Sequence, residues 1–230
     1  MGLFSSSRKK KKEKHGGIAF FSSLFFLLFL SSIHLFLLPG LLDSYAFLRA
    51  SRFIGGIILG LWFAHQFIRG HLSVLLHEYK HAIVSGLVGN KWKGMKVKSD
   101  SGHFQYAYSK DTASYNAFIS LAPYYTPLLL TPALILGLIF EKSNVDIALF
   151  MVGIGYGIDL LINTRDISPA QTDFSNLTGG YKVGIFYVFA MNLFITTTLL
   201  SWIFQGGAGI KLLGYGLWSF MTHVAAYYYS

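Results

Sequence analysis

Cysteine is absent from this chain of 230 residues. That absence excludes a disulfide framework, a cysteine-liganded zinc site and a thiol nucleophile, so any metal must be held by histidine and carboxylate side chains. Charged residues are also scarce, at 13% of the chain against roughly 25% in a typical soluble domain. With 53% hydrophobic residues and a mean hydropathy of +0.49, the composition predicts a membrane protein.

Acidic residues number only 10 against 19 lysines and arginines, which gives a net charge of +9. The basic residues lie in short stretches beside apolar runs, a pattern that sets membrane orientation, so we predict no nucleic-acid partner. Residues 1–16 form a lysine-rich tail that we expect to lie in the cytoplasm against anionic lipid. The apolar run that follows is longer than the apolar part of a signal peptide and lacks a clear cleavage site, so we expect a retained span.

Six apolar windows follow one another along the chain, at 17–38, 53–88, 116–140, 145–164, 184–204 and 208–226. Most are long enough to cross a hydrocarbon core of roughly 30 Å. The second would be about 54 Å long as one helix, so it protrudes, breaks near Gly70 or forms two spans. Six spans place the lysine-rich loop after it in the cytoplasm, as the positive-inside tendency favours. We therefore expect an all-α bundle of about six transmembrane helices.

The run His77-Glu78-Tyr79-Lys80-His81 contains the pattern H-E-x-x-H inside an apolar stretch. Positions i and i+4 lie on the same face of a helix, so two imidazoles can hold one metal. Glu78 lies beside that face, where a carboxylate can act as general base on a metal-bound water. The two histidines could instead satisfy each other or backbone carbonyls, but ionisable residues at membrane depth usually mark functional sites. We therefore predict a zinc site.

The character of the chain changes between residues 89 and 112. Apolar Trp92, Met95 and Val97 are interspersed with lysines, and the turn signal Ser99-Asp100-Ser101-Gly102 follows. This pattern predicts a β-hairpin inserted directly after the motif helix. A strand edge in that place could pair with an extended peptide and present it to the metal, or the hairpin could simply cap the bundle.

A catalytic zinc site commonly has three protein ligands, so a third must be found. The candidates are His65, His71, His103, Asp159, Asp166, Asp173 and His223. Asp173 follows the window 145–164, which runs parallel to the motif helix in either topology, so its carboxylate can reach the same membrane side as the histidines. The alternative is a loop aspartate that caps a short helix. Asp159 lies inside a span, where it could be a ligand or a hydrogen-bonded packing group.

Over about residues 72–180 the chain resembles the site-2 protease family of intramembrane zinc metalloproteases, especially its compact members without a PDZ domain. Residues 77–82 resemble the family's H-E-x-G-H-A helix, residues 88–102 its hairpin, and residues 121–125 the start of its next core helix. Asn163, Pro169 and Asp173 resemble its pattern of asparagine, proline and ligand aspartate. There are two departures: Lys80 stands where the family usually has glycine, and so does Phe174 after the aspartate.

The resemblance implies that His77, His81 and Asp173 bind zinc and that Glu78 activates the water that attacks a peptide bond. It also makes Asn163 a candidate for stabilising the oxyanion or contacting substrate through its amide, although asparagine at a helix end is commonly a cap. Lys80 could alter helix packing or place a cation near the site, but we expect its side chain to extend toward the cytoplasm.

The implied function is that of an intramembrane zinc metalloendopeptidase, which hydrolyses peptide bonds in or near transmembrane segments of protein substrates. Two alternatives are an inactive relative that serves as a membrane scaffold or regulator, and a small transporter with an ion or proton path through the motif. We expect a multi-pass protein of the plasma (inner) membrane with a cytoplasmic N-terminus, although an organelle membrane is an alternative. The sequence indicates no oligomeric state.

The expected organisation has four parts. They are the basic tail at 1–16, the first span and outer loop at 17–52, the protease-like core at 53–180 and two C-terminal spans at 181–230.

Overall fold

Among the residues that the structure describes, three helices are long and apolar enough to cross a membrane: α2 (Ser44–Phe67), α6 (Val145–Arg165) and α8 (Gly180–Gln205). The computed structural model describes residues 26–29, 31–32, 44–99, 101–107, 116–175, 177 and 179–229. Within these ranges the protein is mostly helical with one small hairpin, which confirms the helical membrane fold. The count of six spans is not confirmed. The basic tail and most of the window 17–38 lie outside the described residues.

The window 53–88 contains two helices. α2 ends at Phe67 and α3 (His71–Leu87) begins after a turn at Gly70, whose φ of 53° lies in the left-handed region that glycine adopts without strain. Of the alternatives left open for this window, a break near Gly70 is the one that agrees with the structure. Arg165 joins the two helices across the break, because its guanidinium donates to the carbonyl of Ile68 and lies 3.4 Å from the Ser73 hydroxyl. Residues 44–52, which we expected in a loop, are helical.

The window 116–140 is not a single span, contrary to the prediction. It divides into α4 (Asn116–Ser120), a 3-10 turn η3 (Ala122–Tyr124) and α5 (Leu130–Phe140). The cause is proline: Pro123 and Pro127 lack the backbone N–H that a continuous helix needs. At 11 residues α5 is shorter than the roughly 20 that a perpendicular span requires. The last window forms α9 (Gly207–Tyr229), which is not among the three candidate spans.

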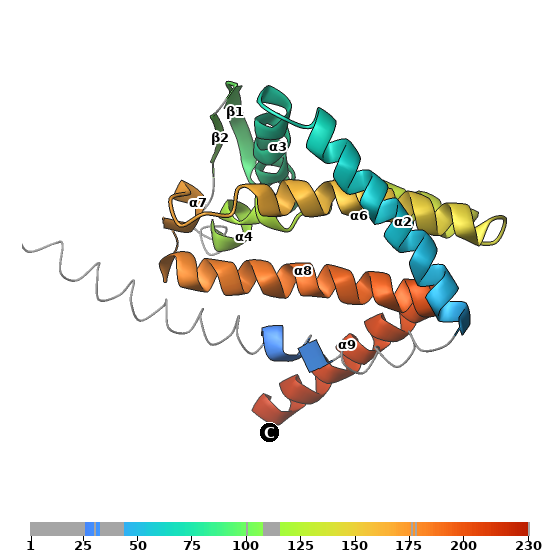
Figure 1. Ribbon diagram of the computed structural model, residues 1–230. Helices are drawn as coiled ribbons and strands as arrows, with labels where there is room; N and C mark the ends of the chain where they lie inside the picture. Colours follow the sequence, from blue (N-terminus) through green and yellow to red (C-terminus); the bar gives the residue numbers. More distant parts are fainter. Residues whose placement is uncertain are drawn as a thin grey trace, which may run out of the picture.

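Glycines allow α2 and α6 to cross in close backbone contact. A Cβ on Gly56 would overlap the carbonyl oxygen of Phe150, and one on Gly153 would overlap that of Phe53. Close approach through small residues is the usual way for helices to associate where lipid removes the hydrophobic driving force. Figure 1 shows α2 lying across α6, with α8 running beside α6.

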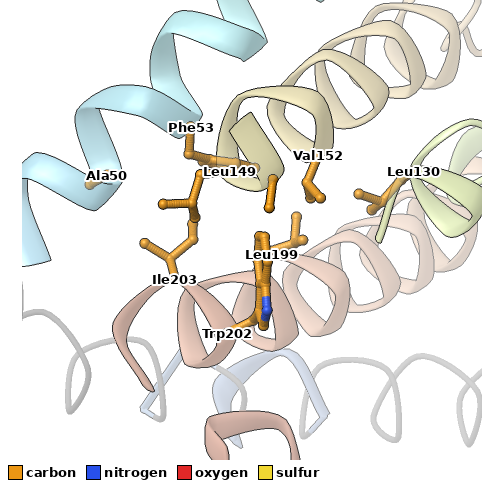
Figure 2. Packing of buried hydrophobic residues seen from close by; sticks show 9 residues of the cluster. Ala50, Phe53, Leu130, Leu149, Val152, Leu199, Trp202 and Ile203 are labelled. Carbon is orange, nitrogen blue, oxygen red and sulfur yellow. The ribbon is translucent and has the colours of Figure 1, made fainter. Parts of the chain in front are cut away.

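A buried apolar cluster lies between these helices. Figure 2 shows Phe53 of α2, Leu149 and Val152 of α6, and Leu199 and Trp202 of α8 converging on one another. At this end of the bundle the Arg49 guanidinium lies 3.7 Å from the Glu141 carboxylate. The second oxygen of that carboxylate accepts a hydrogen bond from the Trp202 indole, so the buried Arg49 and the partly buried Glu141 both have partners.

The opposite end of α6 carries the hairpin and two short helices. Strands β1 (Lys91–Val97) and β2 (Gly102–Ala107) pair antiparallel directly after α3, with a bulge between Trp92 and Gly94, so the predicted hairpin is confirmed. α7 (Thr172–Ser175) follows α6. Figure 1 shows α3, the hairpin and α7 gathered at this end. A second buried cluster, which includes Val84, Ile119, Tyr124 and Phe174, packs beneath them.

The glycine contact predicts a position-specific effect on stability. We expect Gly56→Ala to lower the free energy of unfolding by about 1–3 kcal/mol, because the added methyl group must push the backbone of α6 away. Unfolding of the purified protein in detergent measures this. Gly55→Ala is the matched control, since a Cβ on Gly55 meets only the Phe150 ring at 3.6 Å. Equal stability of the two variants would contradict the close contact.

Candidate metal centre

The two motif histidines lie on one face of α3. The ring centroids of His77 and His81 are 5.2 Å apart, as the i, i+4 spacing requires. His81 is buried and His77 is partly buried. Both rings face the pocket described below, so two imidazoles are available to a ligand at the same point.

Asp173 completes the group from a distant part of the sequence. Its Oδ2 lies 3.2 Å from Nε2 of His77 and 3.7 Å from Nε2 of His81. The three ligand atoms all lie within 4.8 Å of one another, and this is the group of three among the described residues that could hold a metal ion. Two imidazole nitrogens and one carboxylate oxygen form a donor set that suits catalytic zinc.

Neighbouring groups orient these side chains. Nδ1 of His81 donates to the carbonyl of Ile119 over 2.8 Å, which leaves Nε2 with its lone pair free for a metal. The Tyr124 hydroxyl donates to Oδ2 of Asp173 over 3.0 Å. Burial and the adjacent carboxylate raise the pKa of Tyr124, so its hydroxyl stays protonated as a donor. Sequence reasoning missed both groups, because nothing in the spacing places residues 119 and 124 beside the motif.

The carboxylate of Asp173 is ionised in this setting. Burial alone would raise its pKa, but hydrogen bonding and attraction to His77 and His81 outweigh burial and hold that pKa well below its usual range. Phe174 fixes the backbone next to it, because its ring is completely buried against Tyr124 at a centroid distance of 4.7 Å. Phe174 stands where the family resemblance would place glycine, and it anchors α7 in the second buried cluster.

Glu78 lies in the same pocket as the ligand group and is only 6% exposed. The pocket has a volume of about 940 Å³ and is bounded on one side by α3 and on another by the start of β2. A Cβ added to Gly102 would lie 2.5 Å from the Glu78 carboxylate, so only glycine allows β2 to start there without displacing that carboxylate. His103 and Tyr106 of β2 also line the pocket.

The other predicted candidates are placed as follows. His65, His103 and Asp166 line the pocket but lie outside the metal-competent group. His71 is exposed at the start of α3, and the side chain of His223 is outside the described part of the chain. Asp159 is a buried packing group: its Oδ2 accepts hydrogen bonds from the backbone N–H groups of Leu129 and Leu130, both over 2.7 Å.

Lys80 does not extend toward the cytoplasm, so that expectation is wrong. Its side chain is completely buried, with Nζ 3.3 Å from Oδ1 of Asp159 and hydrogen-bonded to Oδ1 of Asn163. These two acceptors lie one turn apart on α6. Their oxygens contact the buried Lys80 ammonium group, which lipid hydrocarbon could not hydrogen-bond. Asn163 is not among the residues that line the pocket, and its role toward substrate stays a prediction.

Residues 54–172, more than half of the chain, match the family described as Peptidase M50B-like. The chain belongs to this family, which is the site-2 protease family. The match ends one residue before Asp173. Comparison with curated proteins and with solved structures gives no match.

Membership carries several family-level consequences. Site-2 proteases are zinc-dependent membrane proteases, and their substrates are membrane proteins. The M50B-like family can also include inactive members. The chain is therefore a membrane protein of a protease family with a histidine and aspartate group that could bind metal.

The geometry of the ligand group predicts which residue provides the third ligand. We expect Asp173→Ala to weaken zinc binding by more than the 10- to 100-fold typical of losing a supporting group, because one of three direct donors is removed. Competition with a chelator of known affinity measures this. His103→Ala is the matched control, since that imidazole lines the same pocket outside the ligand group. Full zinc affinity in Asp173→Ala would show that another residue is the third ligand.

Proposed function

We propose that this protein is an intramembrane zinc metalloendopeptidase that cleaves peptide bonds in or near transmembrane segments of other proteins. The observation that carries the proposal is the group of His77, His81 and Asp173 beside the buried carboxylate of Glu78 in one pocket. Membership of the M50B-like family supports the same chemistry. In this proposal the three grouped residues hold zinc and Glu78 is the catalytic base.

The side chains around the group are suited to zinc. The hydrogen bond from His81 to Ile119 selects the tautomer that a metal needs, and the ionised Asp173 adds a negative charge. When bound in such a site, zinc polarises a carbonyl and makes a water molecule more acidic. No cysteine competes for the ion, because the chain has none.

Glu78 moves the proton in this mechanism. Its carboxylate is adjacent in sequence to one ligand and opens on the same pocket, so it can accept a proton from the attacking water. The same carboxyl group then delivers the proton to the departing amide nitrogen. Contact with Gly102 restricts the rotation of this side chain, which keeps the carboxylate at the reacting end of the pocket.

The hairpin is the part of the pocket best suited to hold substrate. Among the described residues β2 pairs with β1, and in this proposal an extended peptide adds to the hairpin from the side of the pocket beside α3. A transmembrane helix must unwind to pair in this way, so we propose that substrates are cleaved where their helices are weak. Lysines of β1 lie at this end of the molecule, and we place the site toward the cytoplasmic face.

Replacement of the base separates catalysis from metal binding. We expect Glu78→Gln to retain zinc and to lose cleavage by about 10²- to 10⁴-fold, because the amide cannot accept the proton. The assay follows a tagged single-span membrane protein with glycine in its span, incubated with the purified enzyme. Glu141→Gln is the matched control at the far end of the bundle and should keep cleaving. Stoichiometric zinc without cleavage in the wild type would favour a scaffold function.

The close approach of β2 to the Glu78 carboxylate predicts a second effect on cleavage. We expect Gly102→Ala to reduce cleavage at least about tenfold, because the methyl group displaces either the Glu78 carboxylate or the strand from its working position. Gly94→Ala in the same hairpin is the control, since a Cβ there meets nothing within 4 Å. Both variants should still bind zinc. Unchanged cleavage in Gly102→Ala would refute the proposed role of the contact.

A further inference from the structure

Lys80 is the most completely buried charged side chain among the described residues, and it lies within the motif itself. Its exposed fraction is 0%, although its neighbours His77 and Tyr79 are partly or largely accessible. The side chain is not among the residues that line the pocket, and it ends between Asp159 and Asn163 of α6. A bare ammonium group would be very unfavourable here, so these contacts are required rather than incidental.

Asp159 extends the connection to a third element. One carboxylate oxygen faces Lys80 and the other accepts the backbone N–H groups of Leu129 and Leu130, where α5 begins. Both oxygens of this nearly inaccessible group are therefore used. A single buried ion pair links the motif helix, the middle of α6 and the first turn of α5.

The link matters because α3 has little other attachment to α6. Its backbone packs mainly on the hairpin, α4 and η3. Further contacts with α6 include apolar packing by Leu76 and the long contact between Ser73 and Arg165. Because α6 leads into the segment that carries Asp173, the placement of α3 against α6 contributes to the separation of the histidines from Asp173, together with the buried cluster that holds Val84 and Phe174.

We propose that Lys80 and Asp159 are positioning residues that hold the histidines of α3 at metal-binding distance from Asp173. The inference rests on the proposed metal site, and it gives the lysine inside the motif a defined part in that site. The ion pair fixes the distance between α3 and α6, because Lys80 and Asp159 are each held by further hydrogen bonds within a packed interior. Metal ligands tolerate only small displacements, so movement of α3 relative to α6 after loss of the ion pair weakens zinc binding.

The test uses a neutral pair of similar shape. Lys80→Met alone leaves a buried carboxylate without its cation, and Asp159→Asn alone leaves a buried cation without its carboxylate. The double variant removes both charges and keeps an oxygen for the N–H groups of α5. Its thermal stability should therefore recover relative to either single variant. If the pair is a positioning device, zinc affinity of the double variant should nevertheless remain about 10- to 100-fold below that of the wild type.

A second experiment measures the distance between α3 and α7 in the absence of metal. Because the chain has no cysteine, spin labels can be attached at Leu75→Cys on α3 and Ser175→Cys on α7, both of which are exposed. Their distance distribution is measured by pulsed electron paramagnetic resonance in chelator-treated protein. We expect a narrow distribution in the wild-type background and a broadened or shifted one in the Lys80→Met/Asp159→Asn background.

The control is the ion pair between buried Arg49 and partly buried Glu141 at the far end of the bundle. Arg49→Met with Glu141→Gln removes charges that contact the ends of α8 and α9, so it should leave both the label distance and zinc affinity unchanged. An unaltered distance distribution in the Lys80→Met/Asp159→Asn background overturns the inference. If the wild type takes up no zinc, the proposed function fails, and the label distances still decide whether the pair positions α3.

Discussion

The contact between Asp173 and the two histidines is the interaction on which the rest of this structure depends. It joins a helix early in the described chain to a four-residue helix that follows α6. Imidazole nitrogens and a carboxylate oxygen must meet within a few ångströms to hold a metal. Both sides of the group are anchored in buried structure, which suits the proposed metal site: His81 through the carbonyl of Ile119, and Asp173 through Tyr124 and the neighbouring Phe174.

Each end of the bundle has an ion pair that is at least partly buried. At one end Arg49 and Glu141 satisfy each other and the backbone at the ends of α8 and α9. At the other, Lys80 and Asp159 connect the motif helix to α6 and α5. In an apolar interior a charge must be paired and hydrogen-bonded, so each pair fixes the relative placement of several helices. Glycine contacts between α2 and α6 supply the rigid scaffold between the two ends.

The pocket combines chemical groups with a place for an extended chain. Its walls are the ligand-bearing face of α3, the segment at Asp173 and strand β2. Gly102 lies against the Glu78 carboxylate, so the start of strand β2 is next to the proposed base. A peptide paired with β2 would therefore pass beside Glu78, which is the arrangement that hydrolysis of a backbone amide requires.

The sequence by itself determined the membrane character, the motif helix with its histidines on one face, the break near Gly70 and the hairpin. These features are local, because composition, helical spacing and turn residues act over a few neighbours. It also singled out Asp173, through the parallel direction of two helices and a family resemblance. Local proline residues explain the division of residues 116–140, whereas tertiary structure alone decided the burial of Lys80. It alone placed Tyr124 on Asp173 and Gly102 on Glu78. Such contacts join residues far apart in the chain, and their geometry depends on how whole helices pack.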